Sequence, residues 1–306
     1  MTTRFVTDGG LETDLIFHHG VDLPEFAAFP LLDAAGGRRL LTDYYCAYAA
    51  VAARAEVGLL LETPTWRANP DWGARVGFDA AALARVNRDA VGFLRALDTA
   101  GCTTVEVSGT LGPRGDGYLP GPAVDPDEAA DYHRPQLRAF RDAGADRATA
   151  LTLTDVGEAV GIARAAAHVG LPVALGFTVE TDGRLPGGLT LAQAVARVDA
   201  DTAPNYYLVN CAHPDHVARG LGDDGPWRRR IQGLRVNASR QSHAELDEAT
   251  VLDDGDPVEL ATDHARLVQE LPAVQVVGGC CGTDVRHVAA LWGQPPDVIS
   301  AISSST

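Results

Sequence analysis

Three of the five cysteines in this sequence stand where they can hold a metal ion. Cys211 occurs in VNCAHP, and Cys280 and Cys281 are adjacent in VVGGCCGT. Three thiolates suit zinc, which prefers soft ligands, takes tetrahedral geometry and leaves a fourth position for water or substrate. Two alternatives are a structural site closed by His213 and plain packing of small buried cysteines without metal. The glycines around the adjacent pair favour the metal site, because plain packing does not need such close backbone approach.

The remaining cysteines and the ends of the chain bear on where the protein acts. Cys46 lies in a predicted helix and Cys102 directly after one, and we expect both to serve in packing. An odd cysteine count favours reduced thiols and a cytoplasmic location. No apolar run approaches the ~18–20 residues of a membrane span, and the N-terminus lacks the basic and apolar regions of a signal peptide.

The charged residues exclude several kinds of chemistry. All 25 Lys+Arg positions are arginines, against 41 Asp+Glu, which gives a formal net charge of −16. Without lysine the chain cannot be a Schiff-base aldolase, a pyridoxal-phosphate enzyme or a Walker-type phosphate-binding protein. The acidity argues against nucleic acid and anionic membranes as partners. We therefore expect small-molecule partners, while the oligomeric state stays open.

Eight β-rich runs alternate with helical stretches, and several of these runs are apolar on both faces. This alternation predicts an α/β fold, a (β/α)₈ barrel formed as a single domain over residues 1–306. A doubly wound open sheet would need G-x-G-x-x-G after the first strand, where the sequence reads TDGGLE. The predicted strands are Phe5–Asp8, Leu59–Thr63, Thr104–Ser108, Ala148–Thr152, Val173–Thr178, Tyr206–Cys211, Leu234–Ala238 and Val274–Gly278.

Helix start and stop signals lie between the strands. Asp125 and Asp256 each precede a proline and stand three residues before a glutamate, which is capping-box spacing. Asp155 opens a further helix, and Gly170 closes it. Pro135 falls inside the helix that begins after Asp125 and should kink or restart it.

In such a barrel the active site lies at the C-terminal ends of the strands. The sixth and eighth strands would bring Cys211 close to the adjacent cysteine pair. The stretch Ala238–Gly255 is long for a connection between a strand and a helix, which makes it a candidate lid. Candidate substrate-binding residues at the strand ends are Asp8, Gly9, Gly10, Glu62, Trp66, Ser108, Glu180, Asn210 and Asn237.

Four segments together resemble the homocysteine S-methyltransferase family: TDGGLETDL near the start, ETPTWRAN after the second strand, VNCAHP after the sixth and VVGGCCGT near the end. They occur in this order over nearly the whole chain. The resemblance implies a (β/α)₈ barrel in which Cys211, Cys280 and Cys281 hold zinc. It also implies that Asp8 and the Gly9–Gly10 turn lie beside the amino-acid part of homocysteine.

The activity implied by the resemblance is methyl transfer to homocysteine or a related thiol, within methionine biosynthesis. Binding to zinc lowers the pKa of the acceptor thiol, so that its sulfur is nucleophilic at neutral pH. The implied donors are a sulfonium, S-methylmethionine or S-adenosylmethionine, or a quaternary ammonium compound. Such a cation suits aromatic faces and carboxylates, for which Trp66, Trp72 and Glu62 are candidates.

One position departs from the pattern of the family. The fourth strand of the family usually ends in a glutamate that binds the amino group of the substrate, whereas this sequence has Leu151. Either Glu180 or Glu62 takes over that contact, or the acceptor is a thiol without the amine. Two other functions remain open: a zinc hydrolase or lyase with Glu62 as base, and a non-catalytic zinc protein in which His213 completes the site.

Overall fold

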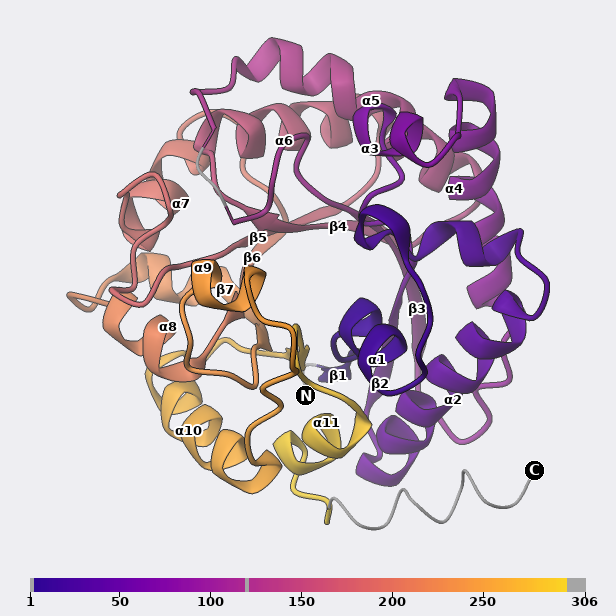
Figure 1. The fold of residues 1–306 in the computed structure, drawn as a ribbon. Coiled ribbons are helices and arrows are strands. Elements are labelled where there is room, and N and C mark those ends of the chain that lie inside the picture. The colour runs from indigo at the N-terminus through magenta and orange to yellow at the C-terminus, as the bar shows by residue number, and fades with distance from the viewer. Residues whose placement is uncertain (1–2, 119–120, 296–306) are drawn as a thin grey trace.

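The computed structural model describes residues 3–118 and 121–295. Within these ranges eight parallel strands close into a barrel in sequential order, with β8 hydrogen-bonded to β1. Helices surround the barrel, which Figure 1 shows nearly along its axis. The predicted (β/α)₈ barrel is thus confirmed. The predicted domain limits, 1–306, include residues 1–2 and 296–306, which lie outside the described ranges.

Each predicted strand is present, with its ends shifted by a few residues. β2 and β6 are buried at every position, because the barrel interior covers one face of each strand and helices cover the other. β3 continues past Ser108 to Leu111, and β7 begins before Leu234, at Ile231. The strands are β1 (Phe5–Val6), β2 (Gly58–Glu62), β3 (Val105–Leu111), β4 (Arg147–Leu153), β5 (Val173–Phe177), β6 (Tyr206–Ala212), β7 (Ile231–Val236) and β8 (Val276–Gly279).

The predicted caps define the helix ends. Asp125 and Asp256 each accept hydrogen bonds from the two backbone N–H groups that lie two and three residues further on. Gly170 ends its helix in the left-handed conformation, with φ of 72°. α5 runs through the exposed Pro135 as one helix, so the predicted restart does not occur. The α-helices are α1 (Leu11–Phe17), α2 (Gly37–Ala55), α3 (Pro70–Arg75), α4 (Ala80–Arg95), α5 (Pro126–Asp142), α6 (Val156–Val169), α7 (Leu191–Asp199), α8 (Pro214–Gly220), α9 (His243–Asp247), α10 (Pro257–Glu270) and α11 (Val285–Leu291).

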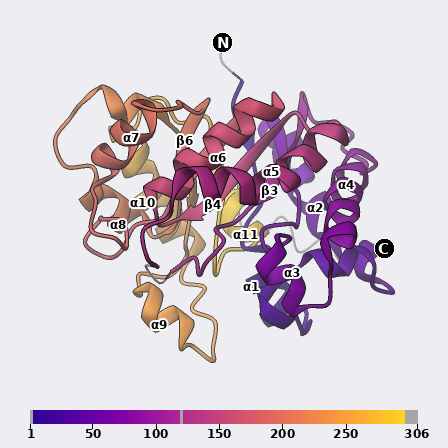
Figure 2. The ribbon, with the colours of Figure 1, turned by 90° about the horizontal axis from the view of Figure 1, so that it is seen from above.

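One short helix stands apart from the ring of helices around the barrel. α9 extends beyond the barrel at the end where α1 and α3 also lie (Figure 2). It occupies the middle of the connection 238–255 that the sequence analysis singled out, and Ser242 begins it with a capping box.

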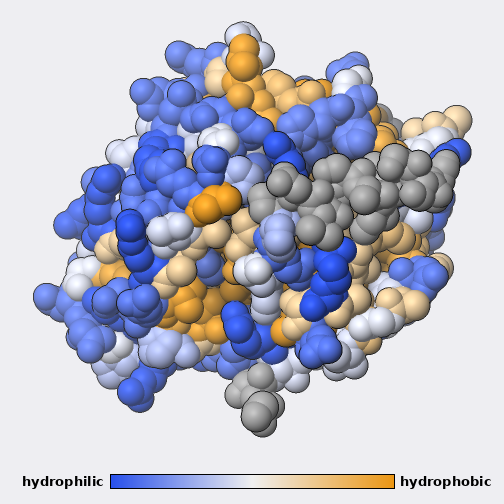
Figure 3. Space-filling view, turned by 90° about the horizontal axis from the view of Figure 1, so that it is seen from below, coloured by the Kyte–Doolittle hydropathy of each residue, from blue (hydrophilic) through white to orange (hydrophobic). Residues whose placement is uncertain are grey.

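Figure 3 shows the outer surface on one side of the barrel. On the side of α10 and α11 it is mainly hydrophilic, with apolar residues gathered near the middle of the view (Figure 3). In the described part of the chain, no helix combines the length and apolarity needed to cross a bilayer.

Candidate metal centre and active site

The three cysteines of the predicted site come together at one end of the barrel. Cys211 lies near the end of β6, and Cys280 and Cys281 directly follow β8. Their three Sγ atoms all lie within 4.8 Å of one another, and those of Cys211 and Cys281 are 3.5 Å apart. Sulfurs around a single tetrahedral zinc, each ~2.3 Å from it, would be about 3.8 Å apart. The cluster therefore has the dimensions and the soft donors that one such ion needs.

The backbone that presents Cys211 adopts an uncommon conformation. Cys211 has φ of 57° and lies at an irregularity between β6 and β7, and Thr152 has φ of 62° at an irregularity between β4 and β5. For residues other than glycine this left-handed region costs ~1–2 kcal/mol each. The Asn210 amide accepts from the Thr152 N–H at 2.9 Å and donates to its hydroxyl at 2.8 Å. Asn210 thus supports the strand ends and does not line the pocket above them.

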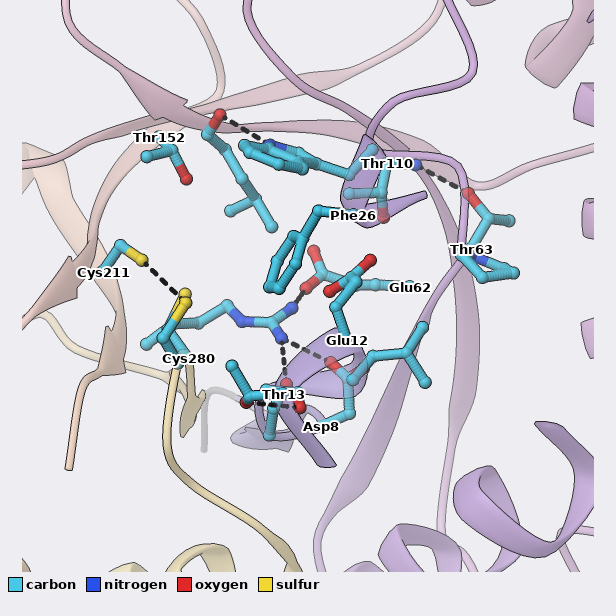
Figure 4. Close-up of a pocket in the computed structure, with 18 of the residues that line it drawn as sticks. Asp8, Glu12, Thr13, Phe26, Glu62, Thr63, Thr110, Thr152, Cys211 and Cys280 are labelled. Carbon is cyan, nitrogen blue, oxygen red and sulfur yellow. Dashed lines mark hydrogen bonds and ion pairs between the residues drawn. The ribbon is translucent and has the colours of Figure 1, made fainter. Parts of the chain in front are cut away.

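A pocket opens beside the sulfur cluster (Figure 4). Its wall is drawn from the ends of several strands, from the start of α1 and from Phe26 and Tyr118 in connecting segments. The residues of the predicted site that line it are Asp8, Gly9, Gly10, Glu62, Trp66, Cys211, Cys280 and Cys281.

The two glycines after β1 allow close packing against the cysteine loop. A Cβ atom on Gly9 would lie 2.6 Å from the Tyr48 hydroxyl, and one on Gly10 would lie 2.5 Å from the Cys280 carbonyl oxygen. The Gly10 N–H also donates to the Thr283 carbonyl at 2.9 Å. A larger residue at either glycine would push the start of α1 away from the sulfur cluster.

A buried arginine holds the acidic side of the pocket together. Arg235, in β7, forms ion pairs with Asp8 at 2.7 Å and with Glu62. It also donates to the backbone carbonyls of Gly9 at 2.9 Å and Gly279 at 3.0 Å. All three charged side chains are buried. Arg235 is therefore the counter-ion for two of the predicted substrate-binding carboxylates and joins them to the strand that leads into the cysteine loop.

The electrostatics of the cluster favour ionisation of one cysteine. Hydrogen bonds from the thiols of Cys211 and Cys281 lower the pKa of Cys280, and the positive charge of Arg235 acts in the same direction. A thiolate is the form that binds a metal ion.

Three other predicted residues lie outside the main pocket. Ser108 was expected at the end of its strand, but β3 continues to Leu111, and the Ser108 hydroxyl instead bonds that of Thr149 at 2.8 Å inside the barrel. Since side chains alternate along a strand, Thr110 faces the pocket in its place. Asn237 lines a separate small cavity behind Cys211.

Glu180 lies in that same small cavity and supports the cluster from behind. Its carboxylate bonds Nδ1 of His243 at 2.9 Å, and Nε2 of His243 lies 2.8 Å from the Cys211 carbonyl oxygen. This chain of contacts fixes the strained backbone at Cys211, so Glu180 acts on the site through His243.

His213 does not join the sulfurs. Among the described residues, the groups that can share one ion place His213 with Asp215 and Asp263, apart from the three cysteines. Its side chain caps α8 by accepting from the Asp215 N–H at 3.2 Å. Burial lowers the pKa of His213 to about 4. The geometry thus disfavours a closed structural site in which His213 is the fourth ligand.

Several pocket residues were not singled out from the sequence. Arg235 could have been found from the sequence, because it is the single charged residue in the strand IQGLRV. Tyr118 gave no such signal, yet its hydroxyl lies 3.1 Å from Sγ of both Cys211 and Cys281, and its ring stacks on His243 with centroids 4.5 Å apart. Glu12, in the first turn of α1, also lines the pocket.

A second, outer pocket adjoins the first, since the two share lining residues. The two pockets share the side chains of Trp66, Tyr118 and Cys281 among their walls, and the connection around α9 adds residues 246–247, 249 and 251–253 to the outer one. Trp72 is not among the residues that line either pocket, and its ring instead contacts the guanidinium groups of Arg67 and Arg75, which lie 3.5 and 4.4 Å from the ring centroid.

Comparison with known proteins gives a consistent result. The sequence profile described as homocysteine S-methyltransferase matches residues 5–293. The homocysteine methyltransferase MmuM from Escherichia coli has a similar fold: its metallated form has a TM-score of 0.72 at 21% identity, covering 95% of this chain and 96% of that one. Its oxidized form has a TM-score of 0.72 at 20% identity, covering 95% of each chain. No curated protein sequence matches this chain.

The Arg235 network leads to a prediction about stability. We expect Arg235→Met to lower the free energy of unfolding by about 3–5 kcal/mol, because it leaves two carboxylates buried without a counter-ion. Adding Glu62→Gln should recover part of this loss. Arg138→Met, at an exposed position of α5, is the control and should change stability by less than about 0.5 kcal/mol. Urea unfolding followed by circular dichroism measures all four proteins, and an Arg235→Met variant as stable as the control would contradict the network.

Proposed function

Since this chain belongs to the homocysteine S-methyltransferase family, we propose that it is a zinc-dependent methyltransferase whose acceptor is homocysteine or a related thiol. The observation that carries the proposal is the convergence of three cysteine sulfurs on one point at the end of the barrel, beside a pocket lined by several strand ends. Its product with homocysteine would be methionine.

Zinc is the metal that this set of donors fits best. Three thiolates and a tetrahedral arrangement are typical of zinc, and an ion held by these three cysteines would have a fourth position for a substrate sulfur. The metallated form of the E. coli relative supports the presence of a metal. When bound, zinc would lower the pKa of the acceptor thiol, so that no protein base has to remove the proton.

The protein side chains have the task of alignment. The acceptor sulfur must approach the methyl carbon opposite the bond that breaks, so the two reactants have to meet in line beside the cysteines. The shared wall of the inner and outer pockets at Trp66, Tyr118 and Cys281 suits that meeting point. Glu62, which a hydrolase would use as a free base, is paired with Arg235, and this favours methyl transfer over hydrolysis.

The outer pocket suits a cationic methyl donor. The side chains of Asp116, Asp247 and Asp253 line it against a single cation, Arg67, within the described residues, and Trp66 and Phe26 add aromatic surface. A sulfonium or quaternary ammonium group is attracted by both features, each aromatic face contributing ~0.5–2 kcal/mol. We propose S-methylmethionine or S-adenosylmethionine as the donor, with a quaternary ammonium compound as the alternative.

The metal site gives the next prediction. The purified chain should bind one zinc ion, and Cys281→Ser should abolish this stoichiometric binding because it removes one of three thiolates. Cys46→Ser is the matched control, since Cys46 lies in α2 away from the cluster. Metal analysis after dialysis measures zinc content, and zinc K-edge absorption should gain one sulfur neighbour when homocysteine is added. Equal zinc in both variants would contradict the assignment.

The reaction itself is tested by turnover. The zinc-loaded chain should convert homocysteine to methionine with at least one donor among S-methylmethionine, S-adenosylmethionine and glycine betaine. Cys211→Ser should lower kcat/KM by more than about 1000-fold, or ~4 kcal/mol of barrier. Mass spectrometry of the methylated product provides the measurement. If a fully zinc-loaded protein methylates no thiol with any of these donors, the proposed function is wrong.

A further inference from the structure

Glu12 stands out among the acidic residues of the inner pocket. It lies in the first turn of α1, next to the glycines that pack against the cysteine loop, and its side chain reaches into the pocket (Figure 4). It is partly exposed to the pocket interior. Within residues 3–118 and 121–295, its carboxylate forms no ion pair, and a hydrogen bond from its own backbone N–H is the contact that stabilises its charged form.

The neighbouring carboxylates are already engaged. Asp8 and Glu62 share the guanidinium of Arg235, and Glu180 bonds His243 outside the pocket. Leu151, on β4, offers only an apolar side chain to the pocket. Glu12 is thus the carboxylate of the described pocket wall that has no cationic partner of its own.

The electrostatic surroundings of Glu12 also favour a cation beside its carboxylate. Burial raises the pKa of Glu12 to about 7, and the negative charges of Asp8 and Cys280 add to this, while Arg235 opposes it. A carboxylate with a raised pKa is destabilised in its charged form, and an ammonium group placed beside it would relieve that cost.

Glu12 lies on the acceptor side of the site and not on the donor side. It lines the inner pocket beside the cysteine cluster, where the acceptor sulfur must lie, and it is not part of the outer pocket. The acceptor side therefore faces Glu12, and the donor side faces the outer aspartates.

We propose that Glu12 binds the ammonium group of the acceptor and thereby selects amino-acid thiols such as homocysteine over thiols that lack an amine. This assignment rests on the proposed function and deepens it. The substrate amine is held from α1 and not from β4, where Leu151 carries no charge.

The test compares L-homocysteine with 4-sulfanylbutanoate, which is the same molecule without the amine. Isothermal titration of the zinc-loaded, full-length chain measures binding of each thiol without turnover. Wild type should bind homocysteine more tightly, and Glu12→Gln should weaken homocysteine binding about 10- to 100-fold, as expected for a lost hydrogen bond to a charged group. The same variant should bind 4-sulfanylbutanoate as wild type does, which shows that its pocket is intact. Glu128→Gln, at an exposed position in the first turn of α5, is the matched control and should change neither affinity.

Each other outcome overturns the assignment in a distinguishable way. If wild type binds neither thiol, the proposed function fails and Glu12 fails with it. If wild type binds homocysteine and Glu12→Gln binds it equally well, or loses both thiols equally, the role of Glu12 alone is wrong. A variant with unchanged homocysteine binding but a raised KM for S-methylmethionine would assign Glu12 to the donor instead.

Discussion

The geometry of this site depends on one buried interaction, the contact of the Arg235 guanidinium with Asp8 and Glu62. It joins the ends of β1, β2 and β7, and its remaining donors bind the backbone of Gly9 and Gly279 on either side of the cysteine loop. Buried charges are tolerated only when each has its partners, because desolvation otherwise outweighs their attraction. A shift of any one of these strands would leave a charge unpaired. The network therefore fixes where the acidic wall of the pocket meets the sulfur cluster.

The sulfur side is held by a second set of contacts, which explains several polar residues that do not touch the pocket. Cys211 is held in a left-handed conformation, and its carbonyl oxygen is contacted by His243 and by the Thr178 hydroxyl at 3.2 Å. Glu180 orients His243, and Asn210 holds the equally strained Thr152 two strands away. A residue keeps such a strained backbone conformation only where several surrounding contacts hold it in place. These residues at the strand ends thus act on the sulfur cluster through backbone geometry.

Local physics explains why much of the fold was predictable and part of the site was not. Apolar runs and aspartate caps act over a few residues, so the strands and most helix ends could be read directly. The adjacent cysteines directly follow β8, and Glu62 is the last residue of β2, so both were found from the ends of the strands. Ser108 was misplaced because β3 ends three residues later. Tyr118 reaches the cluster from a connecting segment, across 93 and 163 residues of sequence, and no local pattern records such a contact.

The balance of charge in the two pockets fits the proposed chemistry as a whole. The described wall of the inner pocket contains three carboxylates and one guanidinium, that of Arg235. The described wall of the outer pocket also contains three carboxylates and one guanidinium, that of Arg67. Methyl transfer from a sulfonium to a thiolate turns a cation and an anion into two neutral thioethers. In the proposed reaction, the negative wall would attract the donor while it is charged and would lose that attraction once the methyl group has moved. The same acidic residues that bind the donor would therefore also favour release of its neutral product.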